Sequence, residues 1–567
     1  MENISFENVR PLSATAKQIL NKRYLWENEK TWDDLVERVV NYIVPRDSPD
    51  FEPTKEMIMH RYFVPNSPCL VNAGKEGAGL SACYVVSFED TIEDILKTIG
   101  DFVYVARKGG GCGTTLSNLR PKGSNVKKST HGYAGGPVAF ANVISEFMAV
   151  ISQGGLRSMA IMFTMSCRHP DIIEFILAKQ NEDDKKIENA NMSVVVDNEF
   201  MELVKADKTY WTEFNGVKYK EYRAKDIFNL IVEGAWRNGE PGLLFQDRIN
   251  DSPYKYTGQV IQATNPCSEQ PLAPNGVCNL GSLDLSKFIK KDGTTDFDKL
   301  EYATRLGFRF LDRVVDKSDY PTPEIAKWAK DNRAVGISPM GFADFCLMKK
   351  IAYGERDSLL ELELVLSSIY NWSKDESEKI GKELGVPKEC KKLPEPRRNI
   401  TLTTAAPTGT VSLIAGCSSG LEPIFSEIVI RNDKTGTYIF EDKLADKDYF
   451  RCAVSSNGSQ EVTWEEHINV LSTAQRNIDS GVSKTINFPN HTHRETIYKA
   501  MIMAWETDCK GIAVYRNGSR KVEVLSVKNV KKDLCPSCSG EMEFINKKNR
   551  CMNPKCNPYR EGDRIEL

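Results

Sequence analysis

Short apolar segments alternate with amphipathic segments from about residue 66 to residue 520, and this alternation constrains the fold more than any other feature. Segments such as "CYVVSF", "SMAIMF" and "MSVVV" have the length and composition of buried strands, whereas "TIEDILKTIGDFVYVA" and "HPDIIEFILAKQ" carry apolar residues at helical spacing. Strands that alternate with helices over this length predict an α/β fold in one large domain, either a barrel or a wide sheet.

Two shorter regions flank the alternating one. Residues 1–65 predict helices, because Leu35, Val39 and Ile43 are spaced to share one helix face behind Thr31, a residue type that favours the N-cap. A linker and a cysteine-bearing tail follow the large domain. We therefore expect a helical region over 1–65, the main α/β domain over 66–525, and the linker with its tail over 526–567.

Composition and charge exclude several classes of protein. The formal net charge is −3 in 567 residues, so no overall field favours nucleic acid or a membrane, and neither partner is expected. The chain shows no export signal and no run of about eighteen apolar residues, which predicts a cytoplasmic location. Its 15 cysteines are therefore expected to be reduced thiols, and five isolated ones are predicted to be structural: Cys69, Cys346, Cys390, Cys452 and Cys509.

Residues 265–282 read "NPCSEQPLAPNGVCNLGS" and carry an unusual set of groups. On an extended loop, alternate spacing projects Asn265, Cys267 and Glu269 to one side, and Pro266 favours an extended conformation at Asn265. A thiol beside a carboxylate and an amide is a plausible catalytic set, since it combines a reactive sulfur, a base and a hydrogen-bonding group. A turn with a buried cysteine explains the same residues without chemistry, and both interpretations stay open at this point.

The histidines argue against thiolate attack, because a nucleophilic cysteine usually needs a histidine as its base. The chain has six histidines, and none has an evident role. Further cysteines occur in glycine- and serine-rich contexts like that of Cys267, notably Cys83 in "LSACYVVSFED" and Cys278 in "GVCNLGS". Two thiols that face one site can deliver two electrons by closing into a disulfide.

Two glycine-rich segments predict loops that approach a ligand. "RKGGGCGTTLSNLRPKGS" spans residues 107–124, and "APTGTVSLIAGCSSGLEP" spans residues 406–423 with hydroxyls and free amides ahead of an apolar run. Such groups can hold phosphate at a helix N-terminus. Neither segment matches the P-loop or the dinucleotide-binding pattern, so each is a weak indication by itself.

Taken together and in order, these segments resemble the ribonucleotide reductases over most of the chain. "NPCSEQ" followed by "CNLGSLDL" resembles their active-site segment, and the likeness extends through "NSPCLVNAG", "LSACYVVS", "QGGLRSMAIMFTM", "NMSVVVDNEF", "NRAVGISPMGFADF", "APTGTVSLIAGCSSGLEPIF" and "GIAVYRNGSR". The ending "VSKTINFP…KGIAVYRNGSR" most resembles class II, the adenosylcobalamin-dependent branch. The class that uses a separate radical subunit has adjacent tyrosines near its C-terminal end, and this chain has no such pair.

The resemblance implies a ten-stranded α/β barrel with a central finger loop. On that loop Cys267 would become a thiyl radical and abstract the 3′-hydrogen of the ribose, while Glu269 takes the proton of the 3′-hydroxyl and Asn265 holds that hydroxyl. Cys83 and Cys278 would supply a proton and two electrons for loss of the 2′-hydroxyl, and would end as a disulfide.

The resemblance also implies contacts and partners. The nucleotide would be contacted by Ser67, Ala82 and Gly111, and its phosphates by the segment Pro407, Thr408, Gly409, Thr410 and Val411. Deoxynucleotide specificity effectors would act at residues 185–191 in a homodimer, and a thioredoxin-like protein or a small thiol would reduce the disulfide. The chain lacks the ATP-cone domain of many relatives, so no shut-off by dATP is expected. No short cobalamin motif is present, so no cofactor-binding residues are predicted.

The tail sets its cysteines in two pairs, Cys535 with Cys538 and Cys551 with Cys556. This spacing predicts a small zinc-ribbon-like unit in which four thiolates hold Zn²⁺. The rival interpretation follows from the resemblance, since class II enzymes use C-terminal cysteines to reopen the active-site disulfide. The further cysteines that follow the ribbon in the family are missing here, which favours zinc or a pair that serves both purposes.

Two other functions compete with an adenosylcobalamin-dependent reductase. A large subunit that needs a separate radical-generating partner has the same chemistry. A non-catalytic nucleotide-binding or nucleic-acid-binding protein on a reductase scaffold belongs to a different class. The joint presence of Cys83, Asn265, Cys267, Glu269 and Cys278 favours catalysis, because a binding protein has no use for the whole set.

Overall fold

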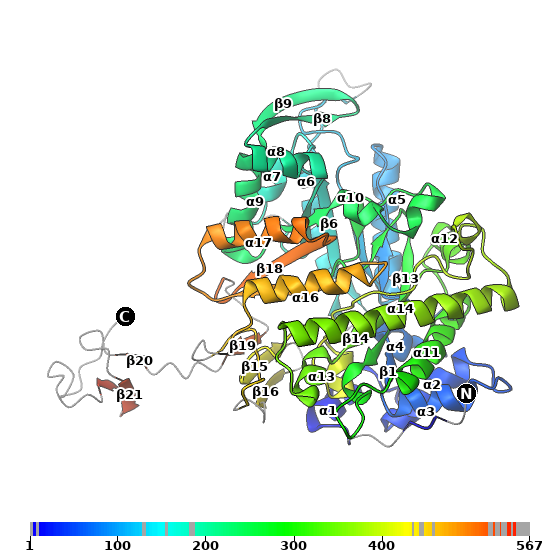
Figure 1. Cartoon of the computed structure of the whole chain (residues 1–567). Helices are drawn as coiled ribbons and strands as arrows, with labels where there is room; N and C mark the ends of the chain where they lie inside the picture. The colour runs from blue at the N-terminus through cyan, green and yellow to red at the C-terminus, as the bar shows by residue number, and fades with distance from the viewer. Residues whose placement is uncertain are drawn as a thin grey trace.

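The computed structural model describes residues 4–6, 11–126, 132–153, 157–180, 187–433, 436–441, 447–455, 460–519, 525–527, 533–534, 541–545 and 548–551. Within these ranges a ten-stranded sheet is surrounded by helices, as the α/β prediction requires (Figure 1). No helix in the same ranges is long and apolar enough to cross a membrane, and the cytoplasmic location stays a prediction.

Four helices form the N-terminal layer: α1 (Ala14–Arg23), α2 (Trp32–Ile43), α3 (Phe51–Met59) and α4 (Ser67–Asn72). Thr31 caps α2, since its side chain accepts a hydrogen bond from the N–H of Asp34 and the Asp34 carboxylate accepts one from the N–H of Thr31. Leu35, Val39 and Ile43 are all buried. The predicted helix and its cap are therefore confirmed.

The central sheet has the strand order β1–β13–β2–β3–β6–β7–β10–β18–β17, and β14 pairs with β13. Its strands are β1 (Phe63–Pro65), β2 (Cys83–Val85), β3 (Gly111–Thr115), β6 (Ile161–Ser166), β7 (Asn191–Val196), β10 (Gly242–Phe245), β13 (Val277–Asp284), β14 (Val335–Met340), β17 (Thr485–Phe488) and β18 (Gly511–Arg516). β1 lies at the end of the predicted helical region and pairs antiparallel with β13.

Groups of parallel strands meet at antiparallel seams in the sheet. The largest group is β2, β3, β6, β7 and β10, and two parallel pairs, β13 with β14 and β17 with β18, flank it. β2 pairs antiparallel with β13, and β10 pairs antiparallel with β18. The strands β6, β7, β13 and β14 are buried along almost their whole length, which agrees with the apolar sequences of β6 and β7, whereas β13 also buries polar side chains such as Asn279 and Asp284.

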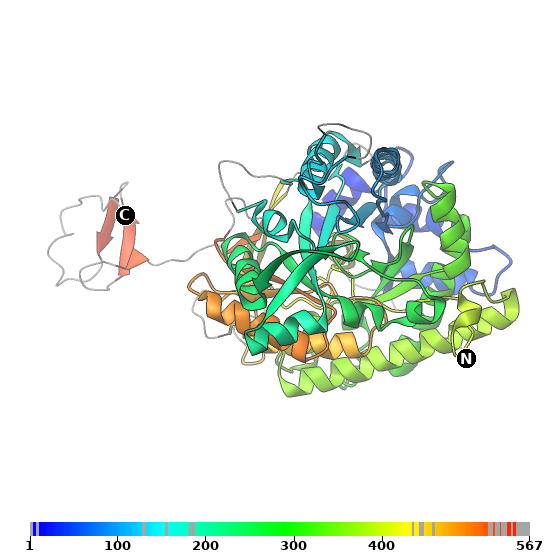
Figure 2. The ribbon, with the colours of Figure 1, turned by 90° about the horizontal axis from the view of Figure 1, so that it is seen from above.

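Helices cover the sheet and connect its parallel strands. They are α5 (Ile92–Arg107), α6 (Pro137–Val150), α7 (Ile172–Leu177), α8 (Asn198–Ala206), α9 (Ala224–Asn238), α10 (Gln246–Asn250), α11 (Phe297–Lys317), α12 (Pro323–Asn332), α13 (Phe342–Lys349), α14 (Arg356–Leu384), α15 (Val411–Ala415), α16 (Trp464–Arg476) and α17 (Arg494–Glu506). Seen from above, the long helix α14 runs along one side of the molecule with α16 against it (Figure 2).

Smaller sheets complete the fold. The hairpin of β8 (Thr209–Phe214) and β9 (Val217–Arg223) forms the top of the molecule in Figure 1. A short hairpin joins β11 (Ala263–Thr264) to β12 (Pro271–Leu272). The others are β4 (Ser152–Gln153) with β5 (Arg157–Ser158); β15 (Ile428–Asp433) with β16 (Gly436–Glu441) and β19 (Leu525–Val527); and β20 (Asp533–Leu534) with β21 (Glu541–Ile545) and β22 (Lys548–Cys551).

Residues 401–405 lie between β14 and the start of β17. The N–H of Thr404 donates to the carbonyl of Ile337 in β14 at 3.0 Å. On the other side, the N–H of Ala405 donates to the carbonyl of Gly481 at 3.1 Å, and the N–H of Ser483 donates to the carbonyl of Ala405 at 2.8 Å. This segment therefore links strands that stand at different places in the sheet order.

A buried ion pair fixes the same segment to the helical layer. Arg333 Nε donates to Asp312 Oδ1 at 2.8 Å, and both side chains are only 3% exposed. Asn399 Nδ2 donates to the same oxygen and to the carbonyl of Arg333, each at 3.0 Å. The cluster joins α11, the end of α12 and the residues that lead into 401–405.

Replacing Asp312 with alanine is expected to lower the free energy of unfolding by about 1–3 kcal/mol, because Arg333 and Asn399 lose a buried acceptor while Asp316 still pairs with the Arg333 guanidinium at 2.8 Å. Urea unfolding at neutral pH measures this loss. Asp331→Ala is the control, since Asp331 pairs with an exposed lysine, Lys327, and should cost under about 1 kcal/mol. Similar losses of stability in the two variants would contradict a special stabilising role for the buried Asp312–Arg333 pair.

Candidate active site

The two predicted redox cysteines face each other across an antiparallel seam. Cys83 of β2 and Cys278 of β13 are direct partners in the register of these strands, and both are buried free thiols. Residues directly opposite on antiparallel strands have Cα atoms about 4.5–5.5 Å apart, which lies within the range that a disulfide spans. The seam therefore allows the two sulfurs to join without a change in the pairing of the strands.

The motif around Cys267 forms the tight turn of the β11–β12 hairpin. The N–H of Ser268 donates to the carbonyl of Asn265 at 3.0 Å, and Ser268 has a φ of 67°, in the left-handed region. The expectation of an extended loop is therefore wrong. The turn buries Asn265 and Glu269 and leaves Cys267 exposed at its tip, because the chain reverses direction between them.

Glycines allow this hairpin to lie against the sheet, backbone on backbone. A Cβ at Gly113 of β3 would stand 1.7 Å from the carbonyl oxygen of Thr264, and a Cβ at Gly481 would stand 2.5 Å from that of Ser268. No side chain fits at these distances, so any other residue displaces the hairpin.

Asn265 and Glu269 both contact Cys83. Asn265 Nδ2 donates to Cys83 Sγ at 3.2 Å, and Cys83 Sγ donates to Glu269 Oε1 at 3.6 Å. Burial raises the pKa of Glu269 more than the hydrogen bonds from Asn265 and Cys83 lower it. Burial also raises the pKa of Cys83 well above its usual range, and the nearby Glu269, Cys278 and Cys267 add to that rise. Cys83 is therefore a thiol at neutral pH.

Glu269 keeps one acceptor unused. Its Oε2 is buried and has no hydrogen-bond partner among the described residues. A buried carboxylate oxygen without a donor is costly, and such groups in native proteins mark a ligand, a water or a catalytic role.

Cys267 opens into a cavity of about 700 Å³. Apolar residues of β10 and β18 form much of the wall, and the lining includes Met162, Asn191, Leu243, Leu244, Pro266, Leu413, Glu422, Phe425, Ser483, Asn487, Lys510, Ile512, Val514 and Tyr515. Asn265, Glu269, Cys83 and Cys278 do not belong to this lining. Cys267 therefore stands between the cavity and the buried pair of cysteines.

The hairpin is also held from behind by the residues that precede β17. The N–H of Gly481 and the hydroxyl of Thr404 both donate to the carbonyl of Glu269 at 2.9 Å. Lys510 Nζ donates to the carbonyls of the two residues before Gly481, at 2.6 and 2.8 Å, and burial lowers its pKa to about 8. These bonds fix the backbone of Glu269 with respect to the sheet.

Two of the residues predicted to contact the nucleotide, Ala82 and Gly111, lie beside Cys83. Gly111 pairs with Cys83 in the register of β2 and β3, and its N–H donates to the carbonyl of Ala82 at 2.8 Å. Ser67 begins α4, and its hydroxyl lies 2.7 Å from that of Tyr24.

The predicted phosphate loop leads into α15. Thr408 has a φ of 51°, and its Oγ1 accepts a hydrogen bond from the N–H of Gly420 at 2.7 Å. Ala406 packs in the same buried cluster as Cys83 and Cys278. None of the residues Ser67, Ala82, Gly111, Pro407, Thr408, Gly409, Thr410 and Val411 lines the 700 Å³ cavity. Contact of these residues with a nucleotide stays a prediction.

The zinc prediction falls largely outside the described residues. Cys535, Cys538 and Cys556 lie outside them, and only the backbone of Cys551 is placed, in β22. Within the described ranges, no group of three or more His, Cys, Asp and Glu side chains is arranged to hold a metal ion. Of the predicted effector segment, residues 185 and 186 also lie outside.

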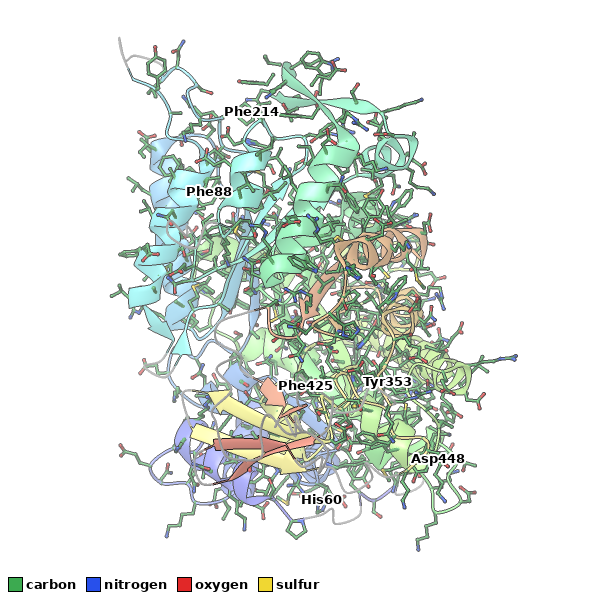
Figure 3. The ribbon with its side chains drawn as sticks, turned by 90° about the vertical axis from the view of Figure 1, so that its left-hand side faces the viewer. His60, Phe88, Phe214, Tyr353, Phe425 and Asp448 are labelled. Carbon is green, nitrogen blue, oxygen red and sulfur yellow. The ribbon has the colours of Figure 1, made fainter. Side chains whose placement is uncertain are left out.

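A second cavity, of about 570 Å³, lies beside the β8–β9 hairpin and includes Phe88, Arg168, His169 and Phe214. Phe88 and Phe214 lie in the upper part of Figure 3, whereas Phe425 of the first cavity lies in the lower part. Arg168 is bonded to Asp197 at 2.5 Å, and His169 Nε2 lies 2.9 Å from a backbone carbonyl. The basic side chains of this second cavity are thus already paired, and we assign no function to the cavity.

Three residues contact the hairpin in ways that the sequence did not predict: Asn191, which was predicted only as part of the effector segment 185–191, Thr404 and Gly481. Lys510, which bonds to the two residues before Gly481, was not predicted either. Asn191 Nδ2 donates to the carbonyl of Pro266 at 2.9 Å. Lys510 opens the segment "KGIAVYRNGSR", so the family likeness offered a signal there. No local pattern marks the contacts of Asn191 or Thr404, because they are made across the fold.

Comparison with known proteins places this fold and site in one family. The family model "Ribonucleotide reductase, barrel domain" matches residues 81–394, 392–448 and 437–515, and "Ribonucleotide reductase, all-alpha domain" matches residues 10–78. These matches cover most of the chain. The chain belongs to the ribonucleotide reductases, and the resemblance seen in the sequence is confirmed.

The names of its relatives indicate the branch. A vitamin B12-dependent ribonucleoside-diphosphate reductase of Thermoplasma acidophilum is 38% identical over 509 residues, which cover 83% of this chain and 66% of that protein. One of Mycobacterium tuberculosis is 32% identical over 570 residues, or 91% of this chain and 81% of that protein. A vitamin B12-dependent ribonucleotide reductase of Rhodopirellula baltica is 26% identical over 79% of this chain and 53% of its own length. These names favour the cobalamin-dependent class over the two alternatives.

Replacing Glu269 with glutamine is expected to raise the melting temperature at neutral pH. Because burial raises the pKa of Glu269, the unfolded chain releases this proton at a lower pH than the folded chain, so stability falls as pH rises through the window between the two values. Glutamine has no proton to release. The gain should be present at about pH 7 and small at about pH 4, as measured by differential scanning fluorimetry.

Glu324→Gln serves as the control of opposite sign, because hydrogen bonds at the start of α12 lower the pKa of Glu324. The Glu324→Gln variant should not have a higher melting temperature than the wild type at either pH. If Glu269→Gln instead lowers the melting temperature at neutral pH, the buried charge of Glu269 does not destabilise the folded chain.

Proposed function

We propose that this chain reduces ribonucleoside diphosphates to 2′-deoxyribonucleotides by thiyl-radical chemistry. The observation that carries the proposal is one small cluster in which Cys83 faces Cys278 and contacts Asn265 and Glu269, with Cys267 at the tip of the same turn. The names of the relatives from Thermoplasma and Mycobacterium support the diphosphate as substrate.

Cys267 starts the reaction as a thiyl radical. It takes the 3′-hydrogen of the ribose, a nearly balanced exchange because the S–H bond and the activated C–H bond have similar strength. The same hydrogen returns to the sugar at the end of the cycle. The exposure of Cys267 to the cavity supports this role, since the unpaired electron has to arrive from outside the buried cluster.

Glu269 takes the proton of the 3′-hydroxyl, and Asn265 holds that hydroxyl. The raised pKa of Glu269 and its unpartnered Oε2 support the assignment, because an effective base has a pKa near the working pH and a free lone pair.

Cys83 and Cys278 supply the reducing equivalents. The 2′-hydroxyl leaves as water after it takes a proton from a thiol, the sugar accepts two electrons from the two sulfurs, and an S–S bond forms between them. One ribonucleotide and one dithiol thus give one deoxyribonucleotide, one water and one disulfide. A thioredoxin-like protein or a small thiol then restores the thiols by exchange.

The cavity beside Cys267 is assigned to adenosylcobalamin. Its volume of about 700 Å³, its apolar walls from β10 and β18, and polar groups such as Glu422, Ser483 and Asn487 suit a large group with apolar faces and amide edges. When bound, the cofactor supplies the radical by homolysis of its Co–C bond. The chain itself orients that group toward Cys267 and excludes water.

Several finer features belong to the same proposal. The ten strands close into a barrel around the β11–β12 finger hairpin, and the hydrogen bonds of residues 401–405 to both β14 and the start of β17 support this closure. The substrate contacts named above, effector binding at residues 185–191, Zn²⁺ in the tail and the cytoplasmic location stay predictions.

A homodimer forms through α5 and α6. The two helices contact each other and expose large apolar side chains, from 47% to 80% of each: Ile92, Leu96 and Tyr104 on α5, and Val143, Phe147 and Val150 on α6. A second copy of the same face covers such a patch best, because an isologous contact buries both copies at once.

The purified chain is expected to form deoxynucleotide anaerobically from a ribonucleoside diphosphate, adenosylcobalamin and a dithiol, without a second protein. Cys267→Ala should abolish this reduction, because no other group can carry the radical, while nucleotide affinity stays within about twofold. Product chromatography and titration calorimetry measure the two quantities. Cys346→Ala is the control, since Cys346 is a buried thiol that neither lines the cavity nor belongs to the buried cluster of Cys83 and Cys278.

Turnover in Cys267→Ala would overturn its role. No product from the wild-type chain under these conditions would instead favour the alternative that needs a separate radical subunit.

Phe147→Asp is expected to convert the dimer to a monomer, because it places a charge in the apolar face of α6, where Phe147 is 47% exposed. Sedimentation velocity measures the change. Leu364→Asp on α14, where Leu364 is 51% exposed, is the control and should leave the assembly intact. A wild-type monomer at high micromolar concentration would contradict the assignment.

A further inference from the structure

The backbone just before Cys267 is held by one side chain of the neighbouring strand β7. Asn191, the first residue of β7, donates from Nδ2 to the carbonyl oxygen of Pro266 at 2.9 Å. Asn191, Pro266 and Cys267 all line the same cavity. The backbone of Asn191 is fixed independently, since it pairs with Met162 in the register of β6 and β7.

This bond complements the anchors on the other side of Cys267. After the tip, the carbonyl of Glu269 accepts hydrogen bonds from Gly481 and Thr404. Before the tip, Pro266 has no N–H, so its carbonyl is the only backbone group through which hydrogen bonds can hold it. Asn191 supplies that bond.

We propose that Asn191 is a positioning residue that sets the direction of the Cys267 side chain; its catalytic consequence rests on the proposed function. The Pro266 carbonyl and the N–H of Cys267 share one rigid peptide plane, so a hydrogen bond to the carbonyl also fixes the position of the Cys267 nitrogen and Cα. The next residue, Ser268, is already in a left-handed conformation, which a freer peptide plane would let relax. Transfer of a hydrogen atom needs the two reacting atoms about 3–3.5 Å apart, so a small rotation of this plane slows the step.

The loop before Asn191 connects this bond to α6. The N–H of Ile187 donates to Asn142 Oδ1 at 2.9 Å, and the N–H of Asn189 donates to Ser145 Oγ at 3.0 Å. Both acceptors belong to α6, the helix assigned to the dimer. Asn191 therefore ties the direction of Cys267 to the placement of α6.

Asn371 provides a control of the same residue type. It lies on α14, is exposed like Asn191, and its side chain makes no hydrogen bond within the described part of the chain. The test variants are Asn191→Ala and Asn191→Asp, and the control is Asn371→Ala. The aspartate has the shape of asparagine but cannot donate to a carbonyl, so it removes the bond without leaving a gap.

The first measurement needs neither cofactor nor turnover. Iodoacetamide alkylation followed by peptide mass spectrometry reports the accessibility and orientation of the exposed Cys267 thiol. Cys83 and Cys278 are buried and should react slowly. Both Asn191 variants should change the alkylation rate at least about threefold, and Asn371→Ala should match the wild type. The second measurement is steady-state kinetics: both Asn191 variants should lower kcat about five- to tenfold, the effect of one hydrogen bond, and leave KM within about twofold.

Each outcome decides between the two proposals. An unchanged alkylation rate and an unchanged kcat in both Asn191 variants would overturn the positioning role, as would equal effects in Asn371→Ala. If the wild type makes no deoxynucleotide but the Asn191 variants alter alkylation of Cys267, the positioning role stands and the proposed function fails.

Discussion

The contact on which this site depends is the approach of the hairpin backbone to two glycines, Gly113 of β3 and Gly481 in the segment before β17. The carbonyl of Thr264 lies where a Cβ of Gly113 would be, and the carbonyl of Ser268 lies close to the position of a Cβ on Gly481. With side chains excluded, the turn enters far enough to bring Asn265 and Glu269 against Cys83. Every proposed chemical role follows from that depth.

The turn also divides the site into two sides. Cys267 faces a cavity, whereas the seam between β2 and β13 holds Cys83 and Cys278, the proposed reducing pair, in the buried interior. This arrangement suits the proposed radical chemistry, in which the electron would enter at Cys267 while the thiols that end the reaction would stay shielded. Burial has a cost, visible in the raised pKa values of Glu269 and Cys83. Hydrogen bonds from Asn191, Thr404 and Gly481 hold the backbone around the tip in place and offset part of this cost.

Much of this site could be predicted from the sequence. The five residues were recognisable because their order and neighbours match a family, and the helix behind Thr31 because capping and periodicity are local. The shape of the motif was predicted wrongly. Alternate spacing implied an extended loop, but Ser268 adopts a left-handed conformation, and only the packing of the hairpin against Gly481 shows why. No local sequence pattern indicated that Cys267 would face the cavity while Cys83 and Cys278 lie on the other side of the turn.

The sequence by itself determined the α/β class, the N-terminal helices and the choice of the five residues proposed to react, since each rests on periodicity or on a motif along the chain. Only the tertiary structure decided that Cys83 and Cys278 are cross-strand partners, that Cys267 looks into a different space from Glu269, and that Asn191 holds the peptide before Cys267. The reason is physical. These relations are set by strand register and by hydrogen bonds between residues 75 to nearly 200 positions apart, and no local pattern encodes the distance between them.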